Sequence, residues 1–344
     1  MAPTRENVAL SEILPTRSGK AWLLQALLLV LAVVLTTPAA AGDSPLHLDP
    51  AIHTAEDGRM PIQQLYAAYL PLVERGWQVD VIAQSQPKGT PAPLPIVALR
   101  TAAPGPAVWI LAGIHGEEPA GPNALAAAVE DLAALGEKRP VVLLPLCNPQ
   151  GYARSWRYLD MPTFSDDVDG QSVGDSSHLL PDPEHPDRAR SAAPSSAEAD
   201  ALTRYVVDMS SKYPPRISLD LHEDDLVAAG YVYSQGELGA RDELARAAVQ
   251  VLRTHGIAIQ LGGETRFGEP IEAGIIGPVT DSSIDELMSA ATILVAGEPR
   301  PGPSARTVLV FETPAKHLPL ERRVAAHLAL IRELAARLAA DPAS

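Results

Sequence analysis

The hydrophobic pattern of the chain predicts strands that alternate with helices. Residues 108–112 and 141–146 are continuous apolar runs, which are typical of strands buried on both faces of a sheet. Between them, residues 121–135 have the alanine-rich composition and the spacing of a helix. Strand, helix and strand in this order form a βαβ unit, so the pattern predicts a mainly parallel sheet.

Further elements are predicted on both sides of this unit. Towards the N-terminus the pattern predicts a helix over 62–75 that ends at Gly76, and strands over 77–83 and 94–100. Towards the C-terminus it predicts helices over 197–212, 237–255 and 320–339, strands over 216–221, 230–233 and 307–311, and loops over 262–284 and 299–304. Residues 160–196 are rich in Asp, Pro and Ser and are expected to form an irregular insertion. Because no linker or repeat interrupts the pattern, we expect a single α/β domain over residues 42–344.

The first 41 residues have the pattern of a secretory signal peptide. Basic residues precede an apolar run over 21–36, and Ala39-Ala40-Ala41 follows as a cleavage site. Gln25 and the short run make a retained membrane anchor the weaker interpretation. We therefore expect an exported protein, periplasmic or secreted, with no stable membrane span after removal of the signal.

Charge and cysteine usage exclude some functions. The formal net charge of −15 argues against a nucleic-acid partner, because phosphate binding needs a basic face. Cys147 is the only cysteine, so no internal disulfide can form. Its place at the end of an apolar run predicts a buried thiol.

Candidate metal ligands follow the predicted strands. His115 and Glu118 are three positions apart after a break at Gly113, so one tight turn can point both side chains at one place. His222 follows the strand 216–221, and ligand sites of parallel sheets gather at such strand ends. Two imidazoles and a carboxylate are the ligands of a catalytic zinc site with an open position, so we expect one zinc ion held by these three residues. Asp220 lies two positions before His222 on the same strand face and could orient a ligand histidine, whereas residues 223–225 are expected to be a solvated rim.

Two further residues could carry catalytic roles. Glu312 follows the strand 307–311, where a carboxylate can take a proton from a zinc-bound water and pass it to a leaving amine. Arg157, nine positions after Asn148, could bring a fixed positive charge to the oxyanion.

These elements resemble a known family in their order and spacing. His115-x-x-Glu118, Asn148-Pro149-x-Gly151 with a following arginine, His222 and Glu312 are similar to the M14 zinc carboxypeptidase superfamily, which includes the succinylglutamate desuccinylase/aspartoacylase branch. The resemblance, which covers about residues 109–313, implies a mixed, mainly parallel sheet of about eight strands with helices on both faces. It also implies that His115, Glu118 and His222 bind zinc, that Glu312 is the general base and acid, and that Arg157 polarises the scissile carbonyl.

The substrate-binding residues depart from the family's pattern. Family members usually carry Asp-Leu-Asn-Arg, whose Asn and Arg grip a carboxylate, but residues 174–179 here read Gly-Asp-Ser-Ser-His-Leu. His178 or Arg154 is a candidate replacement, and Asn148 is a further candidate contact. Ile284 resembles the residue that lines the side-chain pocket of carboxypeptidases. We therefore expect an amide-bond hydrolase acting on peptides as a metallocarboxypeptidase, with N-acyl amino acid deacylation as the alternative.

Three other interpretations have weaker support. Gly170-x-Ser172-x-Gly174 matches the nucleophile elbow of serine hydrolases, but the strand and helix that this chemistry needs are missing from the pattern. The acidic run 166–169 could bind calcium, yet it lacks the spaced ligands of an EF-hand. A non-catalytic exported binding protein on the same scaffold would predict loss of a ligand or of the base, and all four residues are present.

Overall fold

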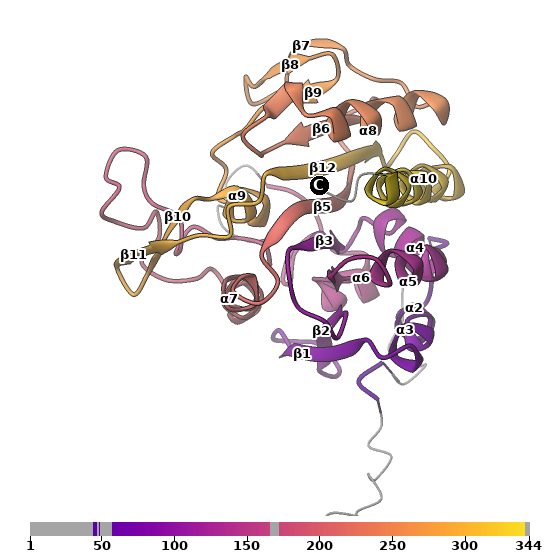
Figure 1. Cartoon of the computed structure of the whole chain (residues 1–344), viewed down its shortest axis with the longest axis horizontal. Coiled ribbons are helices and arrows are strands. Elements are labelled where there is room, and N and C mark those ends of the chain that lie inside the picture. The colour runs from indigo at the N-terminus through magenta and orange to yellow at the C-terminus, as the bar shows by residue number, and fades with distance from the viewer. Residues whose placement is uncertain (1–43, 47, 49–56, 166–171, 341–344) are drawn as a thin grey trace, which may run out of the picture. The chain divides into compact units, whose positions relative to one another are not determined.

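The computed structural model describes residues 44–46, 48, 57–165 and 172–340 (Figure 1). The predicted signal peptide and the acidic run 166–169 lie outside these residues. Residues 45–344 form one unit.

The centre of the unit is a ten-stranded mixed sheet (Figure 1). Four parallel neighbours form its middle, in the order β4 (Val141–Leu144), β3 (Ala107–Ala112), β5 (Pro215–Asp224) and β12 (Thr307–Pro314). Next to β4 lie β2 (Leu94–Arg100) and β1 (Gln78–Ser85), and next to β12 lie β6 (Tyr231–Ser234), β9 (Ile275–Ile276), β8 (Pro270–Glu272) and β7 (Gly262–Glu264).

The expected single α/β domain with a mixed sheet is confirmed, but the expected number of about eight strands is wrong. The difference arises in residues 262–284, which we expected to be a loop and which contribute β7, β8 and β9. A second difference is a two-stranded sheet of β10 (Thr292–Val295) and β11 (Glu298–Pro301), where a loop was expected over 299–304.

Helices cover both faces of the sheet, as expected. One face packs against α2 (Ile62–Ala67), α3 (Leu70–Glu74), α4 (Ala120–Ala127), α5 (Val129–Gly136), α6 (Pro149–Arg154), α8 (Glu243–Thr254) and α10 (Leu320–Ala340). The other packs against α7 (Ala197–Ser210) and α9 (Ile284–Ser289). A cluster of buried apolar side chains lies on each face of the sheet. Strand β3 contributes to both, because Ile110 packs in the cluster on the first face while Trp109 and Leu111 pack in the cluster on the second.

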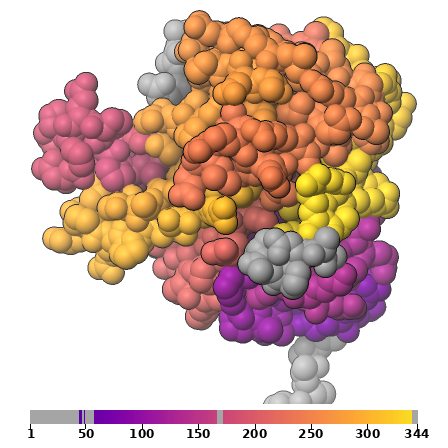
Figure 2. All heavy atoms as spheres, turned by 45° about the horizontal axis from the view of Figure 1, so that its top comes forward, coloured from indigo at the N-terminus to yellow at the C-terminus, as the bar shows by residue number. Residues whose placement is uncertain are grey.

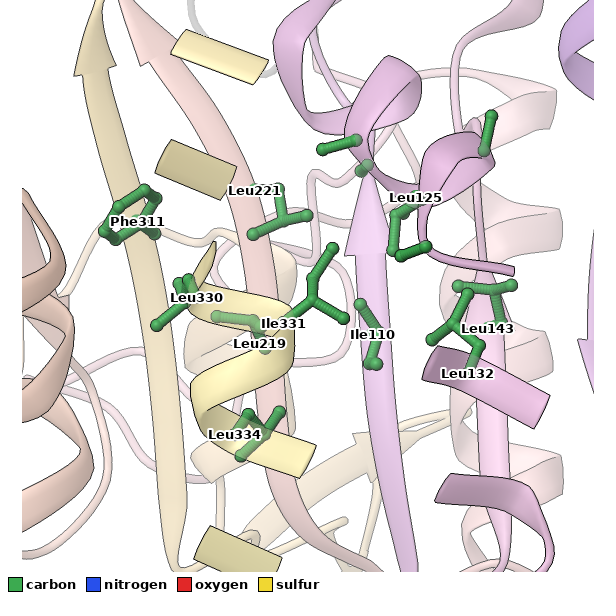
Figure 3. Close-up of a cluster of buried hydrophobic side chains, with 14 of the residues drawn as sticks. Ile110, Leu125, Leu132, Leu143, Leu219, Leu221, Phe311, Leu330, Ile331 and Leu334 are labelled. Carbon is green, nitrogen blue, oxygen red and sulfur yellow. The ribbon is translucent and has the colours of Figure 1, made fainter. Parts of the chain in front are cut away.

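Helix α10 supplies much of the first cluster. Figure 3 shows its side chains Leu330, Ile331 and Leu334 facing those of the central strands, including Leu219 and Ile110. Each such leucine or isoleucine stabilises the fold by about 1.5–3 kcal/mol relative to exposure. None of the described helices combines the length and the apolarity that a bilayer crossing requires.

Several element boundaries differ from the expected ones. The helix expected over 62–75 is divided into α2 and α3, and the one expected over 121–135 into α4 and α5. Helix α8 begins later than expected because Asp242 caps it, accepting a hydrogen bond from Leu244 N at 2.8 Å. Strands β5 and β12 run further than expected, so His222 and Glu312 lie within strands rather than just after them.

The described residues of the segment 160–196 contain no helix or strand, apart from an isolated bridge between Pro181 and Ala189. The segment contacts the β10–β11 hairpin, where Leu294 N donates to Leu179 O at 2.8 Å. Figure 2 shows the pink atoms of this segment and the gold atoms of the hairpin projecting together on one side.

Candidate metal centre

The turn after β3 brings His115 and Glu118 together. Gly113 has a φ of +66°, and a Cβ there would lie 2.6 Å from Leu146 Cδ1, so a larger residue would be strained and crowded. At Gly116 a Cβ would lie 2.1 Å from the carbonyl carbon of Gly151, so the turn approaches the backbone of α6 closely. Helix α4 then begins at Ala120.

Three side chains converge beside this turn. His115 Nδ1 lies 2.8 Å from Glu118 Oε1, and His222 Nδ1 lies 3.0 Å from Glu118 Oε2. One ligand atom from each of the three lies within 4.8 Å of the others. His222 Nε2 lies 3.1 Å from Asp220 Oδ2, so this nitrogen is paired with Asp220. The other ring nitrogen, Nδ1, faces Glu118 and the rest of the cluster. Two imidazoles and one carboxylate in this arrangement fit a zinc ion.

Burial and neighbouring charge shape the titration of these groups. Burial lowers the pKa of His115 to about 4, and the Arg157 guanidinium adds to the effect. Burial alone would raise the pKa of Glu118, but His115 and His222 hold it well below its usual range. The shift at His115 favours the neutral imidazole, which is the form that binds a metal ion. His222 differs, because Asp220 and Glu118 outweigh the effect of burial and raise its pKa well above the usual range, so metal binding there would release a proton.

Glu312 lies beside the same cluster. In the sheet it pairs with His222 of β5 on one side and with Tyr231 of β6 on the other. Its side chain is buried, and Oε2 has no hydrogen-bond partner among the described residues. Burial raises the pKa of this carboxyl well above its usual range, although the charge of His222 opposes the shift. A buried carboxyl with a free oxygen at this position is suited to accept and return a proton.

Arg157 is anchored by two neighbouring carboxylates. Its Nη1 lies 2.7 Å from Glu117 Oε1 and 3.0 Å from Glu118 Oε1, and its Nε donates to Tyr158 Oη at 3.3 Å. Nη2 has no hydrogen-bond partner within the described part of the chain, and the residue lines the cleft. Glu117 was not expected to take part from the sequence, where the only signal is its place next to Glu118.

These groups open into a cleft of about 1080 Å³. His115, His222 and Arg157 line it, together with the α9 residues Ile284 and Asp285 and parts of the insertion. Ile284, the candidate pocket residue, thus lies in the lining of the cleft. Ser172 lines the cleft as well, but its Oγ accepts a hydrogen bond from Gly174 N at 3.1 Å, and no strand or helix among the described residues adjoins it.

The structure places the other three candidate substrate residues outside the cleft lining. Asn148 is fully buried, where its Oδ1 accepts from Gly151 N at 2.8 Å and its Nδ2 donates to Arg157 O at 3.2 Å. The Arg154 guanidinium donates to Leu159 O at 2.7 Å and stacks on the Trp156 ring. His178 lines a separate hollow, with its Nε2 4.0 Å from Asp200 Oδ1.

The expectation of a solvated rim at 223–225 is wrong for Glu223. Because β5 continues through this residue, its side chain is buried, and its Oε2 accepts from Ala120 N at 2.7 Å while Oε1 pairs with Arg323. The expectation of a buried, unpaired Cys147 is confirmed. Asp285, which we had not singled out, is 4% exposed and lies within 4.8 Å of ligand atoms of Asp220 and His222.

Comparisons with known proteins agree with this geometry. The family model described as the succinylglutamate desuccinylase/aspartoacylase catalytic domain matches residues 104–266. Carboxypeptidase 2 of Trichophyton tonsurans is 27% identical over 249 residues, which are 66% of this chain and 41% of that protein. The chain thus spans less than half the length of this fungal relative.

Solved structures share the fold. A protein of Shewanella amazonensis SB2B, named as a candidate metallopeptidase, matches with a TM-score of 0.62 and 23% identity, over 82% of this chain and 94% of that chain. Bovine thrombin-activatable fibrinolysis inhibitor, solved with tick carboxypeptidase inhibitor, matches with a TM-score of 0.53 and 14% identity. This match covers 83% of this chain and 98% of that chain. These likenesses show a shared fold, and the family-model and sequence matches agree with the resemblance drawn from the motifs.

Proposed function

We propose that this chain, a member of the M14 zinc carboxypeptidase superfamily, is an exported zinc-dependent hydrolase that cleaves amide bonds in peptides as a metallocarboxypeptidase. The observation that carries the proposal is the convergence of His115, Glu118 and His222 beside the buried carboxyl of Glu312. Export rests on the N-terminal sequence pattern alone.

Each residue of the cluster has a separate task. His115, Glu118 and His222 would hold one zinc ion, which supplies Lewis acidity and an acidified water when bound. Glu312 would accept a proton from the attacking water at Oε2 and return it to the leaving nitrogen. Arg157 would donate from Nη2 to the developing oxyanion, because Nη1 is already held by Glu117 and Glu118.

The size of the cleft favours a peptide over an N-acyl amino acid. Its volume of about 1080 Å³ is at the top of the range typical of small-molecule sites. The deacylase alternative has its own support, since the matching family model describes a catalytic domain of desuccinylases and aspartoacylases. A non-catalytic binding protein is the weakest alternative, because both the ligand set and the base are present.

Metal content and turnover together test this proposal. We expect about one zinc ion per purified chain by elemental analysis, and its loss in His222→Ala. Glu312→Gln should keep the zinc ion while turnover of peptides falls by several orders of magnitude. Zinc-free protein even after reconstitution would contradict the metal site, and full turnover in Glu312→Gln would contradict the assignment of the base.

The same preparation separates the two substrate classes. A panel of peptides and N-acyl amino acids, assayed for release of a free amine, should show a higher kcat/KM for peptides. Preferential turnover of N-acyl amino acids would favour the deacylase.

A further inference from the structure

A second hollow adjoins the catalytic cleft. It has a volume of about 600 Å³ and lies beside β6, β8 and β9, the orange strands at the top of Figure 1. Phe267 and Asp281 line both this hollow and the cleft, so the two are neighbours. We call it the Phe267 groove; its other lining residues are Tyr233, Glu269, Pro270, Ile276, Gly277, Pro278, Val279 and Thr280.

The groove is mostly apolar, and Phe267 stands at its junction with the cleft. Phe267 is 62% exposed, so a ligand that enters the groove can pack against its ring. No lysine or arginine lines the groove. The Glu269 carboxylate is already engaged, since Oε2 accepts hydrogen bonds from Tyr233 Oη and Thr265 Oγ1 at 3.1 and 2.6 Å.

Phe267 is held in place by the turn that carries it. Thr265 Oγ1 accepts hydrogen bonds from Phe267 N and from Glu269 N, both at 3.2 Å. The Arg266 guanidinium lies 4.5 Å from the Phe267 ring and 4.6 Å from the Phe164 ring of the insertion. Arg157 lies 5.8 Å from the same Phe164 ring. A series of cation–π contacts therefore links the Phe267 ring to Arg157 through Arg266 and Phe164.

We propose that the Phe267 groove binds an apolar or aromatic side chain of an extended peptide whose scissile bond lies at the metal centre. This inference rests on the proposed hydrolase function and narrows its substrate class. An N-acyl amino acid that fills the catalytic cleft would leave the groove empty, whereas a longer peptide would bury the Phe267 ring and one of its own side chains. We choose a substrate segment as the occupant because the groove adjoins the cleft and shares Phe267 and Asp281 with it.

Gly277 gives a way to close the groove. A Cβ built there meets no atom within 4 Å, and its φ is not in the left-handed region, so a larger side chain fits without strain. Gly277→Leu should therefore fill the groove and leave the fold intact. Phe267→Ala should remove the aromatic ring that lies between the groove and the cleft. Val81→Ala is the matched control, because Val81 is a similarly exposed apolar residue, 45% exposed, in β1 at the other edge of the sheet.

The experiment compares peptides that share a scissile bond and differ in one flanking residue. This residue is leucine or phenylalanine in one set of peptides and glycine or aspartate in the other. In the wild type, the apolar residue should lower KM about ten-fold at one flanking position, with little change in kcat. Gly277→Leu and Phe267→Ala should abolish that ratio, and Val81→Ala should keep it. A wild type indifferent to every flanking residue, or a Gly277→Leu variant that keeps the ratio, would overturn the inference.

Binding to a variant without turnover separates this inference from the proposed function. If no peptide is hydrolysed, the catalytic proposal fails, and the same peptides are then titrated into zinc-loaded Glu312→Gln by calorimetry. Tighter binding of the peptide with the apolar flanking residue would still support binding in the groove, provided that the double variant Glu312→Gln/Gly277→Leu loses this preference. Equal affinities for all flanking residues would overturn it.

Discussion

Arg59 is a buried cation that donates hydrogen bonds to the proposed metal-binding turn and to α6. Its side chain has no exposed area, and Nη1 donates to Gly116 O at 2.7 Å and to Tyr152 O at 2.6 Å. Nη2 donates to Ser155 Oγ at 2.8 Å, and Asp57 supplies the opposing charge. One guanidinium thus joins the turn of His115 and Glu118 to the end of α6, from which the chain leads to Arg157.

Replacement of Arg59 should loosen the metal centre. Arg59→Met leaves two buried carbonyls without their donor, and each such loss costs about 1–3 kcal/mol. It also removes the partner of the half-exposed Asp57 carboxylate. We expect at least ten-fold weaker zinc binding by chelator competition and a changed cobalt(II) absorption spectrum, with partial rescue by Arg59→Lys. Arg75→Met is the control, because the Arg75–Glu130 pair is exposed and water screens the attraction between its charges. Unchanged zinc affinity in folded Arg59→Met would contradict this role.

Residues of the site differ in how far they could be predicted from the sequence. His115, Glu118, His222 and Glu312 could be found because each follows an apolar strand, and parallel strands bring such positions together. Arg59 could not, since its partners Gly116 and Tyr152 are 57 and 93 positions away and no local pattern links them. Asp285 was missed for a similar reason, because only packing of α9 on β5 brings it near Asp220.

Among the elements, α6 connects the metal-binding turn to the arginine segment. Its cap is Asn148, which accepts a hydrogen bond from Gly151 N and donates one to Arg157 O. The Arg157 carbonyl also accepts from Gly116 N at 3.2 Å. The cap therefore fixes the direction in which the chain leaves α6 towards the cleft, a different role from the substrate contact expected from the sequence.

Removal of this cap should affect stability and turnover together. Asn148→Ala loses both bonds, and we expect a decrease of about 1–2 kcal/mol in the free energy of unfolding. Because Arg157 then loses an anchor, kcat should fall at least ten-fold while zinc content stays the same. Asp242→Ala loses the cap of α8 and its bond to Thr307 Oγ1, so urea unfolding should show a comparable loss with kcat unchanged. An equal fall in kcat in both variants would assign the effect to stability alone.

The elements that sequence analysis misplaced carry little hydrophobic signal. Strand β7 consists of Gly262, Gly263 and Glu264, all exposed, and β8 buries only Ile271. Their pairing depends on the neighbouring edge of β9 rather than on an apolar pattern of their own. By contrast, β2 has the predicted bounds, because its residues are almost all buried and form a continuous strand-forming run.

At the scale of the whole molecule, the proposed metal site connects distant parts of the chain. His115 and Glu118 follow β3, His222 lies in β5, and Glu312 lies in β12, so the site spans three adjacent parallel strands. A metal ion bound there crosslinks the centre of the sheet only when the strands are assembled. Zinc binding should therefore stabilise the folded state over the unfolded chain.

Removal of zinc should accordingly lower the thermal stability of the whole unit. With free zinc about a hundred times above Kd, binding contributes about 2.7 kcal/mol, which corresponds to a rise of several degrees in Tm. Scanning calorimetry of chelator-treated protein, before and after zinc is restored, measures this difference. His222→Ala should abolish the shift, whereas His317→Ala, which removes an exposed imidazole outside the site, should keep it. The three ligands act as one site and cannot hold zinc equally well without His222. A zinc-induced rise in Tm of the same size in His222→Ala would therefore mean that the stabilising ion binds elsewhere.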